Sequence, residues 1–318
     1  MWAFIVRRLI QAVLIIILVT IIIFFAMRFL PGDPVLVYVS GDTLISSSPE
    51  QIEAIRHEFG LDQPIIVQYI AWVGDVFQGN LGKSIILRSS VNDEIASALP
   101  KTLYMGSIAF VLSIILGIPL GIIAAVRRGK WVDTLSTFVA NIGVTAPVFW
   151  VGIILVLIFG LYLHWLPIQG FVWPEENLGK SISSIVMPVA CLTLYPMATI
   201  ARQTRSAMLE VVRQDYIRTA WAKGLSERVI IIKHAARNGI IPVVTLIGLN
   251  IRQIFGGQVL VEKVFNIPGM GRLSVDALFS QDYAIVQGVI LVIALVVVLA
   301  NLLVDISYGW IDPRIRYD

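Results

Sequence analysis

Side chains that could carry out catalysis are few in this sequence and lie far apart. Its three histidines are His57, His164 and His234, and its single cysteine is Cys191. No G-x-x-x-x-G-K-[ST] phosphate loop, G-x-S-x-G nucleophile elbow or H-E-x-x-H zinc motif occurs. Cys191 lies in an apolar run, where it is interpreted as a small buried side chain. We therefore expect no catalytic site and no metal site, and interpret each histidine as a loop or interface residue.

The strongest functional pattern is a basic, amphipathic stretch, residues 209–239, here called the basic segment. Its centre reads Asp215-Tyr-Ile-Arg-Thr-Ala-Trp-Ala-Lys-Gly224-Leu-Ser-Glu-Arg. Apolar residues recur at helical spacing and Gly224 interrupts them, which predicts two short helices joined by a bend. Such a segment can lie on anionic lipid at a membrane surface, or it can dock into a groove on a cytoplasmic partner. The residues alone favour neither.

The elements that position this segment are apolar runs long enough to span a hydrocarbon core of ~30 Å. Residues of the hydrophobic class make up 57% of the chain and charged residues only 14%, whereas soluble domains carry about a quarter charged residues. The first run exceeds the apolar region of a signal peptide, so we interpret it as a retained span. We expect an all-α polytopic membrane protein with about six transmembrane helices. The approximate limits of the runs are Leu9–Leu30, Thr102–Val126, Thr134–Leu163, Ile182–Ala207, Ile240–Leu260 and Ala284–Tyr308.

Charge in the loops predicts the orientation. With the N-terminus inside, most of the 24 lysines and arginines fall in cytoplasmic segments. Cytoplasmic loops of membrane proteins carry an excess of these residues. Both termini, and the basic segment, are therefore predicted to be cytoplasmic.

The chain divides by composition into three parts: residues 1–30 with the first span, an extracytoplasmic polar segment 31–100, and a five-helix core 101–318. The polar segment is long enough to have structure of its own. Ser48 and Pro49 predict a helix start, and Gly60 predicts its end. The segment can be a lid on the spans or a dock for an external binding protein, together with the loop Glu262–Asp282. We favour docking.

Polar residues within the apolar runs are candidates for a transport pathway, because charge at membrane depth is costly. Arg252 is the first candidate, and it can face a conduit, pair with an acid of a partner, or lie at the interface. Arg28, near the end of the first run, is expected to extend to the lipid headgroups. The polar neighbours of Arg252 are Asn250, Gln253 and Gln258. Three glycines are expected to allow close helix packing, namely Gly117, Gly121 and Gly143.

The basic segment resembles the "EAA" coupling loop of permeases in bacterial ATP-binding-cassette (ABC) importers. Aligned on Gly224, the chain has Arg218-Thr219-Ala220 in place of E-A-A, and His234-Ala-Ala-Arg237 in place of the I-x-L-P tail. Both departures match the variant in dipeptide, oligopeptide and nickel permeases, where the run resembles Y-x-R-T-A-x-A-K-G-L-S-E. Further similar stretches cover essentially the whole chain: Leu30-Pro-Gly-Asp33-Pro, Phe59-Gly-Leu-Asp-Gln-Pro64, Gly79-Asn-Leu-Gly-Lys-Ser84, Ala235-Ala-Arg-Asn238 and Glu262-Lys-Val-Phe265-Asn-Ile-Pro268-Gly-Met-Gly271. The ending of the first run resembles the first, B-type member of the permease pair.

This resemblance implies a type I importer permease in the bacterial inner membrane, surrounded by lipid. It implies a second homologous permease, two ATPase subunits and an extracytoplasmic substrate-binding protein as partners, and no nucleic acid. ATP and Mg²⁺ belong to the ATPase subunits, so this chain is expected to bind no cofactor and to be no enzyme. Gly224 would form the bend, beside an apolar ridge of Thr219, Ala220 and Leu225. The rim residues would be Asp215, Arg218, Lys223, Glu227 and Arg228.

Short peptides are the substrate class that the resemblance implies, and nickel or glutathione are the alternatives. An ion-driven secondary transporter is a different class, which inverted repeats and membrane-embedded acids would favour. Neither feature is evident in the sequence. A membrane enzyme is disfavoured by the missing catalytic motifs.

Overall fold

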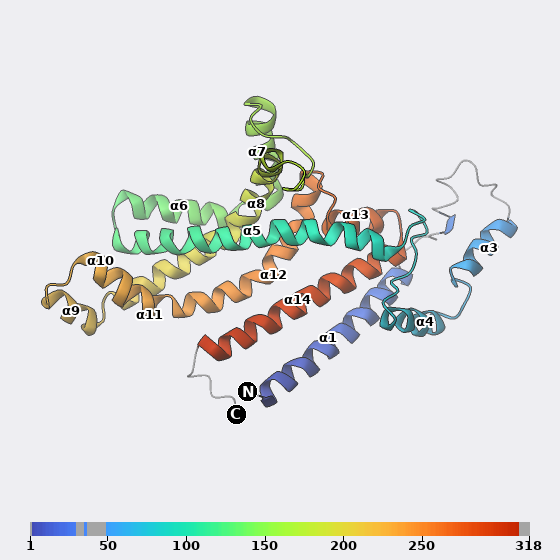
Figure 1. Cartoon of the computed structure of the whole chain (residues 1–318), viewed down its shortest axis with the longest axis horizontal. Coiled ribbons are helices and arrows are strands. Elements are labelled where there is room, and N and C mark those ends of the chain that lie inside the picture. The colour runs from blue at the N-terminus through green and yellow to red at the C-terminus, as the bar shows by residue number, and fades with distance from the viewer. Residues whose placement is uncertain (1, 30–34, 37–48, 312–318) are drawn as a thin grey trace. The chain divides into compact units, whose positions relative to one another are not determined.

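The chain folds into helices that group into two compact units (Figure 1). The computed structural model describes residues 2–29, 35–36 and 49–311, and the side chains of residues 6–29, 35–36, 49–250, 258–302 and 304. Unit 1 holds the described part of residues 1–102 together with Pro268–Leu302, and unit 2 consists chiefly of Leu103–Ile267. The helices of unit 1 are α1 (Trp2–Phe29), α3 (Pro49–Glu58), α4 (Ile65–Phe77), the start of α5 (Val91–Val126), α13 (Met270–Phe279) and α14 (Tyr283–Ile311).

Unit 2 begins with residues 103–126 of α5, and its other helices follow along the chain. They are α6 (Trp131–Thr145), α7 (Val148–Leu155), the π-helix η1 (Val156–Tyr162), α8 (Leu178–Val211), α9 (Asp215–Ala222), α10 (Glu227–Val229), the π-helix η2 (Ile230–Ala236), α11 (Arg237–Gly239) and α12 (Ile241–Val264).

Length and composition of the helices confirm the predicted polytopic membrane fold. Four described stretches are apolar and long enough to cross a bilayer on their own: Val6–Phe29, Val91–Val126, Leu178–Val211 and Tyr283–Leu302. Two further helix pairs qualify together: Trp131–Thr145 with Val148–Tyr162, bent by 109°, and Glu227–Gly239 with Ile241–Asn250, bent by 55°. Counting each bent pair as one span gives up to 6 spans.

The bend of 109° divides the predicted run Thr134–Leu163. It falls at Ala146, whose φ of −73° and ψ of 127° are extended, and at Pro147, which has no backbone N–H. A residue before proline is disfavoured in helical geometry because the proline ring crowds it. The run is therefore not one continuous helix, although its composition is uniformly apolar.

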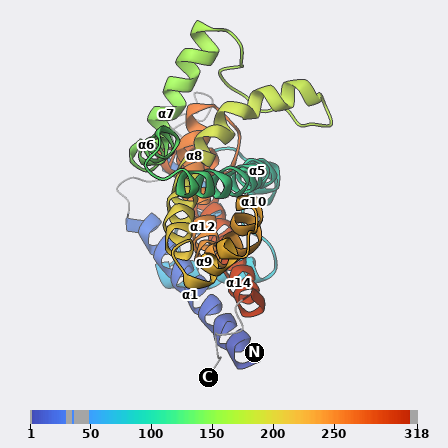
Figure 2. The same ribbon diagram turned by 90° about the vertical axis from the view of Figure 1, so that its left-hand side faces the viewer.

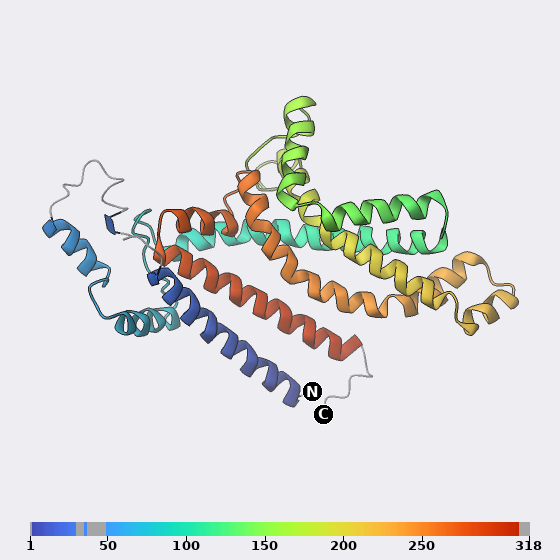
Figure 3. The ribbon, with the colours of Figure 1, turned by 180° about the vertical axis from the view of Figure 1, so that it is seen from behind.

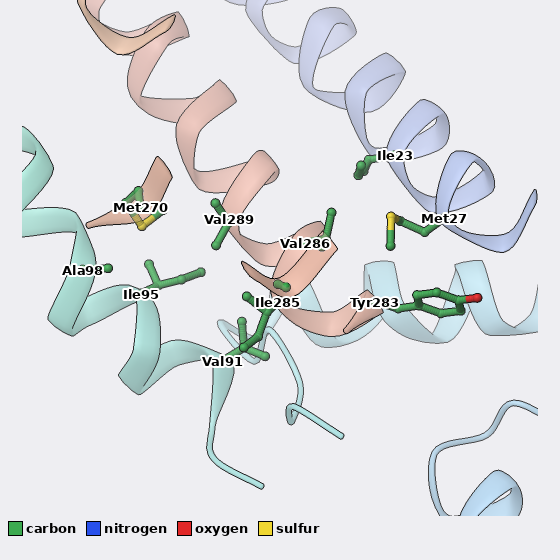
Figure 4. Close-up of a cluster of buried hydrophobic side chains, with 11 residues drawn as sticks. Ile23, Met27, Val91, Ile95, Ala98, Met270, Tyr283, Ile285, Val286 and Val289 are labelled. Carbon is green, nitrogen blue, oxygen red and sulfur yellow. The ribbon is translucent and has the colours of Figure 1, made fainter. Parts of the chain in front are cut away.

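The core of unit 1 forms where helices distant in sequence meet (Figure 4). Ile23 and Met27 of α1 project toward Val286 and Tyr283 of α14, and Val91 of α5 lies beside α14 as well (Figure 4). The side chain of Met27 is only 1% exposed. Burial of these side chains holds the start of α14 against the end of α1.

The predicted helix in the polar segment is confirmed. It begins at Pro49 and ends at Glu58, and Gly60 follows with a φ of +63°. The N–H of Gly60 donates to the carbonyl of His57 at 3.0 Å, and the N–H of Leu61 donates to that of Arg56 at 2.9 Å. These bonds form the glycine-terminated helix end that the sequence indicated. The predicted cap, Ser48, lies outside the described residues.

Part of the polar segment is fixed to the start of α14. The Ser84 hydroxyl donates to the carboxylate of Asp282, and Asp282 accepts from the N–H of Ile285 at 3.3 Å. Asp282 is 1% exposed, and this burial raises the pKa of its carboxyl group. The loop around Ser84 is therefore anchored to the helical unit.

The side chain of Arg28 makes several contacts within unit 1, and its expected reach to the lipid headgroups stays a prediction. Its Nε donates to Oε1 of Gln68 on α4 at 2.9 Å. The guanidinium carbon lies 4.7 Å from the ring centre of Phe24 and 4.8 Å from that of Tyr283. Two aromatic rings and one amide oxygen thus hold the guanidinium in place.

In unit 2, α8 packs against α6 and α12 and is approached closely by α5. Its course beside α12 is seen from behind in Figure 3. A Cβ on Gly121 of α5 would lie 2.5 Å from the carbonyl oxygen of Ala201. A Cβ on Gly143 of α6 would lie 2.7 Å from the Cβ of Ala198. Gly117 faces α8 in the same way. The prediction that these glycines allow close packing is therefore confirmed.

The predicted division into residues 1–30, 31–100 and 101–318 follows composition along the chain and stays a prediction. In space, all three parts contribute to unit 1, because α13 and α14 pack with α1 and with the polar segment.

Candidate functional site

The basic segment lies at one end of unit 2, and Figure 2 views that end with α9 and α10 toward the reader. The segment begins where α8 ends, and α9 follows as a helix of 8 residues. Ile217 and Ala220 are three residues apart and so share a face of α9. They are 1% and 7% exposed and pack with Met208 and Ile230. The inner face of α9 is therefore held by its own unit.

The predicted bend at Gly224 is confirmed. Its φ is +74°, and its N–H donates to the carbonyl of Trp221 at 2.9 Å. The N–H of Leu225 donates to the carbonyl of Ala220 at 3.4 Å. A Cβ on Gly224 would meet no heavy atom within 4 Å. Backbone conformation, and not space, is thus what favours glycine here.

The second half of the basic segment is a helix with wider turns. It runs through α10, η2 and α11, with π-helical hydrogen bonding over Ile230–Ala236. Nδ2 of Asn238 donates to the hydroxyl of Tyr216 at 2.8 Å, which ties this helix to α9. The helix continues into α12 through the 55° bend. The basic segment therefore connects directly to α8 at one end and to α12 at the other.

The outward surface of the basic segment, here called the docking face, combines charged and apolar side chains. The predicted apolar ridge included Ala220, but the side chain of Ala220 is buried and is not part of this face. Trp221 is 48% exposed and Val229 is 39% exposed, which makes them additional members. An aromatic residue within a charged helix was the signal for Trp221, although the predicted site omitted it. The predicted residues that are exposed are Asp215, Arg218, Thr219, Lys223, Gly224, Leu225, Glu227 and Arg228.

The predicted pathway residues do not gather at an opening within the part of the chain that the structure describes. Asn250 is 5% exposed, and its Nδ2 donates to the hydroxyl of Thr199 on α8 at 3.3 Å. Gln258 is 1% exposed. The side chains of Arg252 and Gln253 lie outside the described residues. Asn250 joins α12 to α8, and the pathway role stays a prediction.

The sequence reasoning missed an ion pair that supports the basic segment. Oδ1 of Asp133 on α6 lies 2.6 Å from Nε of Arg205 on α8, and its Oδ2 accepts from Nη2 at 2.9 Å. Oδ2 also accepts the N–H of Gly129 at 3.0 Å. Arg205 lies near the end of α8, so this two-point bond fixes the part of α8 that leads into α9. A separation of 72 residues left no local signal for the pair.

Comparison with known proteins gives two family matches. Residues 117–317 match the family described as "Binding-protein-dependent transport system inner membrane component". Residues 1–106 match the N-terminal family of the same membrane components.

Individual relatives extend over the full length. The chain is 41% identical over 319 residues, 100% of both chains, to a putative peptide transport system permease of Brucella abortus. It is 38% identical to the oligopeptide transport system permease AppB of Bacillus subtilis, over 100% of both chains. It is also 38% identical to the glutathione transport system permease GsiC of Escherichia coli, over 99% of both chains.

A solved structure supports the fold. The crystal structure of an amino acid ABC transporter with histidines matches 70% of this chain and 94% of its own, with a TM-score of 0.50 and 13% identity. The two family matches and the full-length relatives identify the family. The chain belongs to the binding-protein-dependent transport system inner membrane components, as a permease subunit of an ABC importer.

Proposed function

We propose that this chain forms half of the translocation pathway of an importer for di- and oligopeptides. Its partners are a second, homologous permease, two ATPase subunits that bind ATP and Mg²⁺, and an extracytoplasmic substrate-binding protein. Both termini and the basic segment are cytoplasmic. The relatives named as peptide and oligopeptide permeases support the substrate class, because they match over the full chain.

The docking face is the proposed contact with an ATPase subunit, and its construction is the observation that carries the proposal. Exposed Trp221, Leu225 and Val229 lie among charged residues at one end of unit 2. Apolar and aromatic anchors within a polar rim are typical of protein interfaces. The inner side of the same segment packs against residues of α5 and α8. A force on the docking face therefore reaches the spans through a packed core.

Coupling then follows from two conformations of the importer. ATP binding closes the ATPase subunits, and the docked α9 moves with them. Because α8 and α12 are continuous with the two ends of the basic segment, they move as well, and the pathway opens alternately to either side. The ATPase site and the transport pathway are coupled because ATP and the substrate each bind one of the two conformations more tightly than the other.

A substitution at Leu225 tests the docking face. Leu225 is 37% exposed, so Leu225→Asp leaves the fold intact but places a carboxylate in the proposed interface. Burying an unpaired carboxylate between proteins costs at least about 1.4 kcal/mol, which lowers affinity about tenfold or more. We expect the purified permease pair to retain fewer ATPase subunits and ATP-driven uptake in proteoliposomes to fall accordingly.

Leu87→Asp is the matched control, since Leu87 is 51% exposed in the polar segment of unit 1. It should leave ATPase retention unchanged. Normal retention and uptake in the Leu225→Asp importer would contradict the proposed docking face.

Glutathione is the second candidate substrate, because a relative named as a glutathione permease matches nearly as well. Uptake by the whole importer, with its own binding protein, separates the candidates. Labelled di- and tripeptides, glutathione and Ni²⁺ are compared at equal concentration. Preferred uptake of peptides supports the proposal, whereas preferred uptake of glutathione or Ni²⁺ overturns its substrate class.

A further inference from the structure

A pocket in unit 1 is lined by residues whose buried hydrogen-bond donors have no acceptor in the described part of the chain. The pocket has a volume of about 240 Å³ and lies between α1, α4, the loop after α4 and the start of α14. Three of its lining residues carry a buried nitrogen that lacks a hydrogen-bond partner among the described residues: Nη1 of Arg28, Nε1 of Trp72 and Nε2 of Gln287. Most buried polar groups in folded proteins are hydrogen-bonded, so three donors around one pocket need an explanation.

The neighbours of Arg28 fix its position without satisfying Nη1. Nε2 of Gln68 donates to the carbonyls of Leu61 and Gln63, at 3.3 Å and 2.7 Å, so its oxygen is the atom left to face Arg28. That oxygen accepts from Nε of Arg28 at 2.9 Å. The rings of Phe24 and Tyr283 approach the guanidinium but accept no conventional hydrogen bond. Nη1 of Arg28 is therefore buried without an acceptor among the described residues.

The other two donors are placed independently of Arg28. The Trp72 ring lies 5.8 Å from the Phe24 ring, which holds the indole on α4. Gln287 follows Tyr283 by one helical turn on α14 and is only 3% exposed. Arginine and tryptophan nitrogens donate and never accept, so the group that satisfies them must be an acceptor.

Charge around the pocket favours a negatively charged acceptor. The charged side chains that line it are Arg28, Lys83 and Asp75, which together leave one positive charge. Buried charge is normally paired, and hydrogen bonds between a guanidinium and an anionic oxygen are among the strongest in proteins. Large apolar side chains on the same end of α1 are exposed, with Ile22 at 65% and Phe29 at 77%. Acyl chains would contact these residues.

We propose that this pocket binds a phosphate group, through Arg28, Trp72 and Gln287. The group is the headgroup phosphate of a phospholipid beside α1 or a free phosphate ion. The bound phosphate joins α1, α4 and α14. The transport function proposed above neither requires nor excludes this binding.

Binding measurements on the whole purified importer, after removal of endogenous lipid, test the site. One arm titrates phosphatidylglycerol in mixed micelles and the other titrates inorganic phosphate, with native mass spectrometry and calorimetry as readouts. We expect one ligand per chain and a Kd raised at least about tenfold by Arg28→Gln, the loss expected for one hydrogen bond to a charged group. Binding of the lipid alone identifies the headgroup as the source, whereas binding in both arms identifies phosphate itself.

Two further variants keep the test valid if Arg28→Gln impairs folding. Trp72→Phe and Gln287→Met remove one donor each and retain the shape, and each should raise the Kd. Arg7→Gln is the matched control, because it removes an exposed arginine from the other end of α1, and it should leave the Kd unchanged. Absence of binding in both arms, or equal affinity in wild type, Trp72→Phe and Gln287→Met, overturns the proposal.

Discussion

At the scale of single residues, two ion pairs of unit 2 differ in what they can contribute. In the pair Asp133–Arg205 the two side chains are 9% and 31% exposed. In the pair Asp215–Arg218 they are 95% and 76% exposed. Water and salt screen the second pair, and exposed pairs contribute little to stability. The first pair joins α6 to α8, whereas the second lies on the exposed surface of α9.

Substitution of Asp133 should therefore be destabilising. Asp133→Ala leaves the Arg205 guanidinium without its carboxylate and the N–H of Gly129 without its acceptor. We expect a loss of about 2–3 kcal/mol in the free energy of unfolding, since removal of one member of a largely buried pair leaves a charge unpaired. Thermal unfolding of the purified permease pair measures the loss. Asp215→Ala is the control and should leave the Tm unchanged. An equal decrease of the Tm in both variants would contradict the larger contribution of the Asp133–Arg205 pair to stability.

At the scale of helices, glycines determine how closely α5 and α6 approach α8. Gly121 and Gly143 approach α8 so closely that a Cβ would collide with it. Helices in membranes gain little from burying apolar surface against each other, because lipid is apolar too, and close packing of small residues supplies attraction instead. α8 leads directly into the basic segment, so its packing also determines where the docking face stands within unit 2.

A matched glycine pair tests this packing. Gly121→Ala places a Cβ 2.5 Å from the carbonyl oxygen of Ala201 and from Cβ of Thr204, so α5 must move away from α8. Overpacking of this kind costs about 1–3 kcal/mol, and the Tm should fall. Gly74→Ala in α4 meets no atom within 4 Å and should leave the Tm equal or higher, because alanine favours helix. A Tm for Gly121→Ala at or above wild type would argue against close α5–α8 packing.

At the scale of the whole molecule, topology decides whether the proposed function is possible. An ATPase subunit can reach the docking face only if the basic segment is cytoplasmic. The excess of lysine and arginine in this segment predicts that side. The polar segment around Leu87 is then extracytoplasmic, where a substrate-binding protein can reach it.

Cysteine labelling tests this topology directly. In a Cys191→Ala background, Ser226→Cys places a thiol in the exposed turn after Gly224, and Leu87→Cys places one in the polar segment. We expect an impermeant maleimide to label Leu87→Cys in intact spheroplasts and Ser226→Cys only in inverted vesicles. Labelling of Ser226→Cys from outside would refute both the topology and the docking face.

Several features could be predicted because local chemistry determines them. Pro49 and Gly60 bound α3, since proline suits a first helical turn and glycine suits a left-handed end. Gly224 bends the basic segment for the same backbone reason. The spans follow from apolar length, since a bilayer requires about 20 such residues. Full-length similarity then identified the family.

Tertiary structure alone decided which way side chains face and which distant residues meet. Ala220 packs into the core, Arg28 binds Gln68, and Asp133 pairs with Arg205, none of which periodicity or composition indicates. Such contacts depend on how helices far apart in sequence pack, and many pairings suit the same apolar pattern. The sequence by itself determined a membrane permease with a bent basic segment. Only packing determined which residues form the docking face and which donors surround the pocket beside Arg28.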